Sequence, residues 1–178
     1  RMVIEKVIDI INENQVTQKI AINLSINSLL DPEFVNWFKQ TMINPVLNSQ
    51  LVFELDELKT TQYFDEASKF IESFTKIGCL FALDDFGSGL NSIKYISTLN
   101  LYYVKISSSL IKNIQTNIDE QFYLRTLIEA IRGLDMLVIA KGVEHLGQQE
   151  ILQQYGINEF QGYLFAKPDV ISEFIKNK

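Results

Sequence analysis

The stretch MLVIAKGVEH, residues 136–145, joins a run of apolar and small side chains to a charged end. Residues 136–140 predict a buried strand, and Lys141 and Gly142 follow directly. Similar short apolar runs predict strands over 19–25, 51–55, 79–84 and 102–106, and EFQGY (159–163) predicts a further short strand. Each of these also ends at or near a polar residue, namely Asn23, Glu54, Asp84, Lys105 and Gln161. The polar strand ends are the feature that any predicted fold must explain.

Between the predicted strands, apolar residues recur at helical spacing. The predicted helices cover residues 2–14, 31–43, 61–78, 91–98, 119–134, 146–156 and 169–178. Asp31 is the expected N-cap of the second helix, with Pro32 at its first position, and Gly78 is expected to end the third. Strands that are followed by helices in this way predict an α/β fold with a parallel sheet.

A doubly wound sheet and a (β/α)8 barrel both fit this alternation. The polar strand ends favour the barrel, because a barrel brings all of them to one face. A doubly wound sheet brings together only those beside its switch point. A full barrel has about 250 residues, whereas the chain has 178. We therefore expect a TIM-type (β/α)8 barrel whose first strands are missing from this chain.

The composition limits the class of function. Hydrophobic residues make up 47% of the chain, which is enough for one packed domain, and the formal net charge is −6. This charge argues against binding to a nucleic-acid backbone. No apolar run approaches the length that spans a bilayer, so no direct membrane contact is expected from this segment. The single cysteine, Cys79, is expected to be packed and unreactive.

Several of the strand ends carry oxygen ligands. Asn23, Glu54 and Asp84, with Asp85 beside it, suit a hard divalent cation such as Mg²⁺. Carboxylates that cluster without a metal repel one another and raise their own pKa values. The alternative is that each polar residue simply ends its strand and meets water.

Six segments of the chain resemble, in order, the motifs of the EAL domain family. They are INLS (22–25), FELDE (53–57), FALDDFGSG (81–89), VKIS (104–107), VIAKGVE (138–144) and FQGYLFAKP (160–168). The family comprises bacterial phosphodiesterases and receptors of cyclic di-GMP. The resemblance implies a modified (β/α)8 barrel with one antiparallel strand. It also implies that residues 1–178 are a partial EAL domain, the C-terminal three quarters or so of the barrel.

The resemblance implies hydrolysis of one phosphodiester bond to linear 5′-pGpG, assisted by Mg²⁺ or Mn²⁺. The implied metal ligands are Asn23, Glu54, Asp84 and Asp85. The implied ligand-binding positions are Asn23, Asp84, Asp85 and Gln161. The implied catalytic positions are Lys105, near the attacking water, and Glu57, which steadies the loop after the DDFG strand. Glu144 matches the second glutamate of the usual AEGVE motif.

Three departures from the family pattern bear on activity. The EAL strand itself, with a metal-binding glutamate, would lie upstream of Arg1. Ser107 replaces the aspartate of the KID motif, and a neutral hydroxyl holds a divalent ion less tightly than a carboxylate. Lys141 replaces the glutamate of AEG and adds a cation beside the expected metals. With these changes the resemblance predicts a non-catalytic receptor of cyclic di-GMP in a larger bacterial protein, with or without a bound metal.

Two alternative functions stay open from the sequence. One is an active or residual Mg²⁺-dependent phosphodiesterase, and the other is a protein-interaction module that no longer binds the nucleotide. The expected partners are cyclic di-GMP, a second copy in a homodimer, and upstream GGDEF or sensory domains, but no nucleic acid. The expected location is the cytoplasm, including the cytoplasmic part of a membrane-anchored protein.

Overall fold

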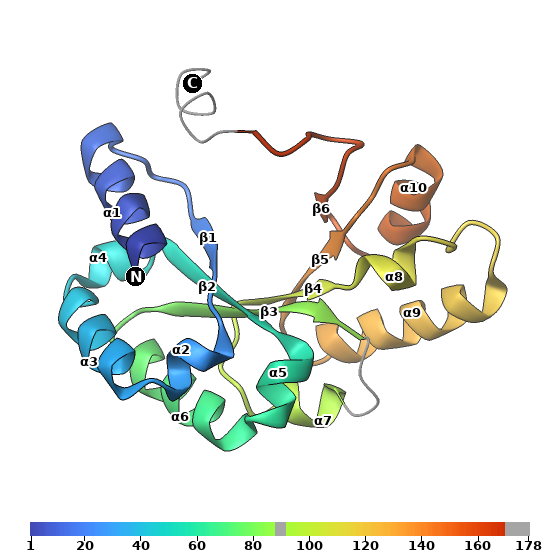
Figure 1. Cartoon of the computed structure of the whole chain (residues 1–178). Coiled ribbons are helices and arrows are strands. Elements are labelled where there is room, and N and C mark those ends of the chain that lie inside the picture. The colour runs from blue at the N-terminus through green and yellow to red at the C-terminus, as the bar shows by residue number, and fades with distance from the viewer. Residues whose placement is uncertain (88–91, 170–178) are drawn as a thin grey trace.

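The computed structural model of the protein describes residues 1–87 and 92–169. Six strands form one sheet in the order β1-β2-β3-β4-β5-β6, and each pairs in parallel with the next. The strands are β1 (Ile20–Asn23), β2 (Leu51–Asp56), β3 (Leu80–Phe86), β4 (Tyr103–Ile106), β5 (Leu137–Lys141) and β6 (Glu159–Gln161). The sheet curls into a half-barrel (Figure 1), which confirms the predicted barrel with missing strands. The sequential order excludes a doubly wound sheet, whose strand order reverses at a switch point.

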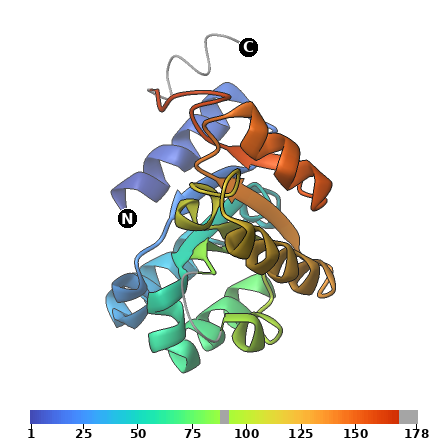
Figure 2. The ribbon, with the colours of Figure 1, turned by 90° about the vertical axis from the view of Figure 1, so that its right-hand side faces the viewer.

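The helices lie outside the curled sheet, and a view turned by 90° shows α9 and α10 along its side (Figure 2). They are α1 (Met2–Asn14), α2 (Ile26–Leu30), α3 (Pro32–Thr41), α4 (Pro45–Asn48), α5 (Glu57–Gln62), α6 (Phe64–Thr75), α7 (Ser92–Ile96), α8 (Ser108–Ile111), α9 (Ile118–Arg132) and α10 (Leu146–Gln154). Six predicted helices are therefore present as α1, α3, α6, α7, α9 and α10. Of the last predicted helix, over 169–178, only residue 169 lies within the described part of the chain, and it is not helical.

Most predicted boundaries shift by one or two residues, and two of the differences change the elements next to the charged strand ends. The helix predicted over 61–78 is divided, because Tyr63 (φ −117°, ψ 46°) separates α5 from α6. The strand predicted to end at Asp84 continues to Phe86. The predicted N-cap is confirmed, since the Asp31 side chain accepts the backbone N–H of Glu33 at 2.9 Å at the start of α3. Gly78 has a positive φ of 94° just after α6.

The main core lies between the outer face of the sheet and the helices. Phenylalanines from α3, β2, α6 and β3 pack together within it, and these are Phe34, Phe38, Phe53, Phe70, Phe74 and Phe81. The fully buried Phe38 ring lies 5.0 Å from the Phe53 ring and 4.7 Å from the Phe74 ring, measured between centroids. Cys79 is buried next to this region, and burial raises the pKa of its thiol to about 12. The prediction of a packed cysteine is confirmed.

The side chains on the inner face of the curled sheet change from apolar to charged along the strands. A second, smaller cluster on this face contains Val52, Ala82 and Tyr103. Two residues further along the same three strands are Glu54, Asp84 and Lys105. Because side chains alternate along a strand, residues two apart point to the same face. The inner face is therefore apolar toward the strand starts and charged toward the carboxyl ends, where barrels place their chemistry.

Within residues 1–87 and 92–169, no helix is both long and apolar enough to cross a lipid bilayer.

Candidate functional site

The sheet register places the predicted site residues along one edge of the half-barrel. Asn23 of β1 lies beside Glu54 of β2, and Lys141 of β5 lies beside Gln161 of β6. Asp84 belongs to β3 and Lys105 to β4, between these two pairs. The strand ends that the sequence singled out are thus brought together along the sheet edge. Asn23 and Gln161, on the two outer strands, are exposed to solvent.

Lys141 is the centre of the first charged group. Its Nζ donates hydrogen bonds to Asp84 Oδ2 at 2.9 Å and to Asp85 Oδ1 at 3.0 Å. The three side chains are 28%, 19% and 44% exposed, in that order. The contact joins β5 to β3, and β4 lies between these strands in the sheet. The long lysine side chain therefore crosses the inner end of β4 to reach both acids.

The backbone of Asp85 explains how two consecutive acids face one lysine. In a regular strand, neighbouring side chains point to opposite faces. Here the pairing of β3 with β4 is irregular between Leu83 and Phe86, and Asp85 has a left-handed φ of 56°. That conformation is uncommon for a residue with a Cβ atom and costs about 1 kcal/mol or more. The ion pair of Asp85 with Lys141 offsets part of the cost of this strained backbone conformation.

A second charged group surrounds Glu54. Its Oε1 atom accepts a hydrogen bond from Tyr103 Oη at 2.5 Å and lies 2.6 Å from Lys105 Nζ. All three side chains are largely shielded from solvent, with exposures of 5% for Glu54, 12% for Lys105 and 6% for Tyr103. Sequence reasoning missed Tyr103. Its position two residues before Lys105 in a strand was the available signal, because it places both side chains on the same face.

The remaining predicted positions have neighbours of other kinds. Glu57 is buried at the start of α5, and its Oε2 atom accepts the backbone N–H of Gly87 at 3.0 Å. This contact reaches the segment that directly follows Asp85 and Phe86. The Ser107 hydroxyl is buried 3.0 Å from the Ser109 hydroxyl, at the start of α8. Serine at this position therefore adds no negative charge to the acidic group.

The pKa values of Lys141 and Tyr103 are both raised, which keeps each side chain protonated in the hydrogen bonds described above. Burial opposes the charged form of Lys141, but the hydrogen bonds and charges of Asp84 and Asp85 outweigh it and raise the pKa of Lys141. Burial, together with the hydrogen bond to Glu54, raises the pKa of the Tyr103 hydroxyl well above its ordinary value. Lys141 therefore stays a cation and Tyr103 stays a hydrogen-bond donor at neutral pH.

These shifts predict how stability depends on pH. The unfolded chain loses the Tyr103 and Lys141 protons near their ordinary pKa values of 10.0 and 10.5, whereas the folded protein holds them longer. The contribution of both groups is complete below pH 10 and is lost as the pH rises through the folded pKa values. We expect Tyr103→Phe to make the alkaline loss of stability less steep. At pH 8 it should cost about 1.5–3 kcal/mol, the range for a hydrogen bond to a charged group.

Urea unfolding followed by circular dichroism at several pH values between 8 and 11 measures both effects. The matched control is Tyr102→Phe, because the neighbouring Tyr102 belongs to the same cluster and its ring packs against Tyr103. Equal slopes and equal costs for the two variants would contradict the assigned role of the Tyr103 hydroxyl.

The residues present do not fit a divalent metal ion in this arrangement. Of the implied ligands, Glu54 is held by Lys105, and Asp84 and Asp85 are held by Lys141. Across residues 1–87 and 92–169, no three or more histidine, cysteine, aspartate or glutamate side chains are grouped to hold a metal. A divalent ion at the acids would have to displace lysine ammonium groups that are already hydrogen-bonded there.

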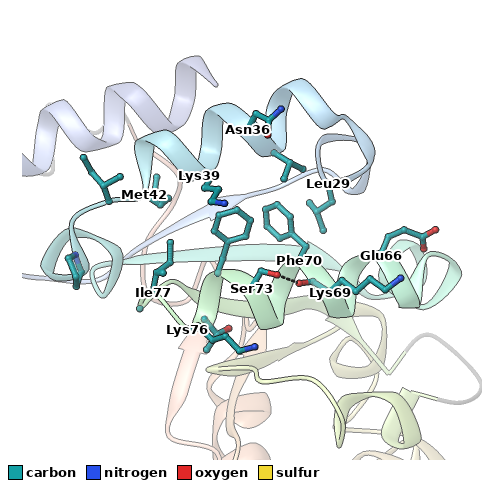
Figure 3. Close-up of a pocket in the computed structure, with 16 residues that line it drawn as sticks. Leu29, Asn36, Lys39, Met42, Glu66, Lys69, Phe70, Ser73, Lys76 and Ile77 are labelled. Carbon is teal, nitrogen blue, oxygen red and sulfur yellow. Dashed lines mark hydrogen bonds between the residues drawn. The ribbon is translucent and has the colours of Figure 1, made fainter.

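A groove on the outer surface is separate from these charged groups. It lies between α3 and α6 and is shown in Figure 3. Met42, Phe70 and Ile77 line it, with Lys39 and Lys69 also at its walls. The groove contains none of the strand-end residues. The candidate site is therefore the charged edge of the inner face, not this groove.

Comparison with known proteins identifies the family. The EAL domain sequence profile matches residues 1–168. The cyclic di-GMP phosphodiesterase PdeB of Shewanella oneidensis is 32% identical over 156 residues, which are 87% of this chain and 18% of PdeB. The chain spans about a fifth of the length of PdeB and of two further curated relatives that it matches.

Two solved structures show the same fold. The EAL domain of FimX from Pseudomonas aeruginosa, bound to cyclic di-GMP, matches with a TM-score of 0.84 and 26% identity, over 95% of this chain and 69% of that one. LapD from Vibrio cholerae, solved as an S helix-GGDEF-EAL protein bound to cyclic di-GMP, matches with a TM-score of 0.85 and 26% identity. That match covers 92% of this chain and 40% of LapD. The chain belongs to the EAL domain family.

Proposed function

We propose that this chain is a non-catalytic receptor domain for cyclic di-GMP in a larger bacterial protein. The observation that carries the proposal is the position of Lys141 Nζ, within 3.0 Å of both Asp84 and Asp85. Hydrolysis in this family is assisted by divalent ions, which generate the attacking hydroxide from bound water. The ammonium that is hydrogen-bonded to both acids places a positive charge where such an ion would bind, so the ion would first have to displace it.

The second charged group supports the same conclusion. Lys105, at the family position near the attacking water, lies 2.6 Å from Glu54 Oε1. Both partners of the resulting ion pair are largely buried, so separating them has a high desolvation cost. Lys141 stands where the family has a glutamate, and the nearby Ser107 hydroxyl does not make up for that lost carboxylate. Losing a positioned acid or base lowers a rate by about 10²–10⁴-fold, so we expect turnover to be suppressed at least that far.

Nucleotide binding is supported by two further observations. FimX and LapD, each 26% identical to this chain, are described as bound to cyclic di-GMP. The polar strand ends of this chain converge at the carboxyl edge of the half-barrel, where barrel proteins bind their ligands. We place the ligand there, with Asn23 and Gln161 on the two sides of the charged groups. Homodimerisation, upstream GGDEF or sensory domains and a cytoplasmic location belong to the same proposal.

A residual phosphodiesterase is the second candidate. It is favoured by the retention of Glu54, Asp84, Asp85 and Lys105 at family positions on three adjacent strands. If a divalent ion can separate the lysines from these acids, some hydrolysis follows.

A turnover assay separates the two candidates. The protein, in its longest natural form, is incubated with cyclic di-GMP and either Mg²⁺ or Mn²⁺, and the linear dinucleotide is quantified by chromatography. The receptor proposal expects a rate below about 0.01 s⁻¹, which is 10²-fold under the lower end of the usual 1–10³ s⁻¹ of enzymes. Turnover within the usual range, abolished by Asp84→Asn, would establish the phosphodiesterase instead.

A further inference from the structure

We infer that the Lys141 ammonium is itself the cation that binds the ligand phosphate, so that nucleotide binding is independent of divalent metals. The inference rests on the proposed function, since it names the residue that holds the nucleotide at the same site.

The hydrogen-bond inventory of Lys141 leaves one donor available. A lysine ammonium has three N–H donors, and Asp84 Oδ2 and Asp85 Oδ1 accept two of them. The side chain remains 28% exposed, so the third donor can reach a ligand at the open edge of the sheet. The two acids fix the direction of that donor, because both come from a single irregular segment of β3.

An unused acceptor lies beside this donor. Asp84 Oδ1 is buried and has no hydrogen-bond partner within the described part of the chain. A buried carboxylate oxygen without a partner is costly, which points to a donor that arrives with a ligand or with water. A nucleotide with a ribose hydroxyl next to its phosphodiester carries both a matching donor and a matching acceptor. The pair of atoms, Lys141 Nζ and Asp84 Oδ1, therefore suits this ligand chemistry.

Charge explains why the lysine is needed. The two charged groups together contain three carboxylates, from Glu54, Asp84 and Asp85, and two lysines. One of these lysines, Lys105, is only 12% exposed and is paired with Glu54. Without Lys141 an incoming phosphodiester would meet Asp84 and Asp85 with no cation between them. Like charges at contact distance repel strongly where solvent is partly excluded. Lys141 thus reduces this repulsion and offers a charge-assisted hydrogen bond to the ligand.

Calorimetric titration of cyclic di-GMP into the protein in its longest natural form tests the inference. In EDTA the natural protein is expected to bind saturably, and excess Mg²⁺ should change the affinity less than threefold. Lys141→Gln should weaken binding by about tenfold or more, as expected for losing a hydrogen bond to a charged group. Lys141→Arg, which keeps the charge, should stay within a few-fold of the natural protein. Lys69→Gln, in the outer groove, is the matched control and should bind normally.

The outcomes separate the inference from the proposed function. If the natural protein binds but Lys141→Gln binds equally well in EDTA, the inference is overturned and the receptor proposal stands. A tenfold gain in affinity of the natural protein on adding Mg²⁺ also overturns the inference, and this comparison needs no variant. If the natural protein shows no binding either in EDTA or in Mg²⁺, the proposed function fails and the inference fails with it.

Discussion

Lys105→Met is expected to lower the free energy of unfolding by about 3–5 kcal/mol, the range for removing one partner of a buried ion pair. Methionine keeps most of the apolar stem of lysine but removes the ammonium. Glu54 is only 5% exposed, and within residues 1–87 and 92–169 Tyr103 would be the one donor left at its Oε1 atom. The loss of the compensating charge, rather than the loss of packing, dominates this change. Urea unfolding at pH 7, followed by circular dichroism, measures it.

The matched control for this prediction is the double variant Lys105→Met and Glu54→Gln. It removes both charges at once, so that no uncompensated carboxylate is left in the interior, and most of the lost stability should return. A cost for Lys105→Met alone within about 0.5 kcal/mol, the size of an ordinary surface substitution, would show that Glu54 is solvated in the folded protein. The ion pair between Lys105 and Glu54 would then contribute nothing measurable to the free energy of unfolding.

Restoring the family acids is expected to create a response to divalent cations that the natural protein lacks. In the double variant Lys141→Glu and Ser107→Asp, the ammonium between Asp84 and Asp85 is removed and two carboxylates are added. Oxygen ligands that repel one another without a metal are stabilised by Mg²⁺ or Mn²⁺. At a metal concentration 100 times the dissociation constant, the gain in stability is about 2.7 kcal/mol. Thermal unfolding with and without metal measures it.

The neutral pair of substitutions Lys141→Gln and Ser107→Asn serves as the control for the metal response. It removes the same ammonium and alters the same two positions without adding negative charge, and it should respond to metal much less than the acidic pair. The natural protein should show no change in melting temperature. An equal rise in melting temperature for the natural protein would show that a divalent ion displaces Lys141 readily, which favours the residual phosphodiesterase.

The sequence was sufficient to predict the strands and the edge on which the site lies. Every strand except β6 was marked by an apolar run, and the polar residue at each strand end, such as Asn23 or Gln161, required no knowledge of distant contacts. The short helices α2, α4 and α8 and the first four residues of α5 were not predicted. Each of these helices has four to six residues, too few to display a helical repeat of apolar positions.

The contacts within the site could not be predicted from the sequence. The joint pairing of Lys141 with Asp84 and Asp85 depends on the left-handed backbone of Asp85 and on a lysine that crosses a whole strand. Neither feature follows from residue type or spacing. The sequence predicts that Lys141 adds a cation near the expected metals, but only the structure shows that this cation is hydrogen-bonded to two acids. This distinction, which only the structure provides, separates a damaged metal site from a site with its own internal cation.

The central claim, that the domain holds cyclic di-GMP without cleaving it, is tested most directly by equilibrium dialysis. Cyclic di-GMP is dialysed against the protein in its longest natural form with excess Mg²⁺, and the nucleotide on both sides is then identified by chromatography. The account predicts that intact cyclic dinucleotide accumulates on the protein side in a saturable way. Linear dinucleotide, or equal concentrations of the cyclic form on the two sides, would contradict it.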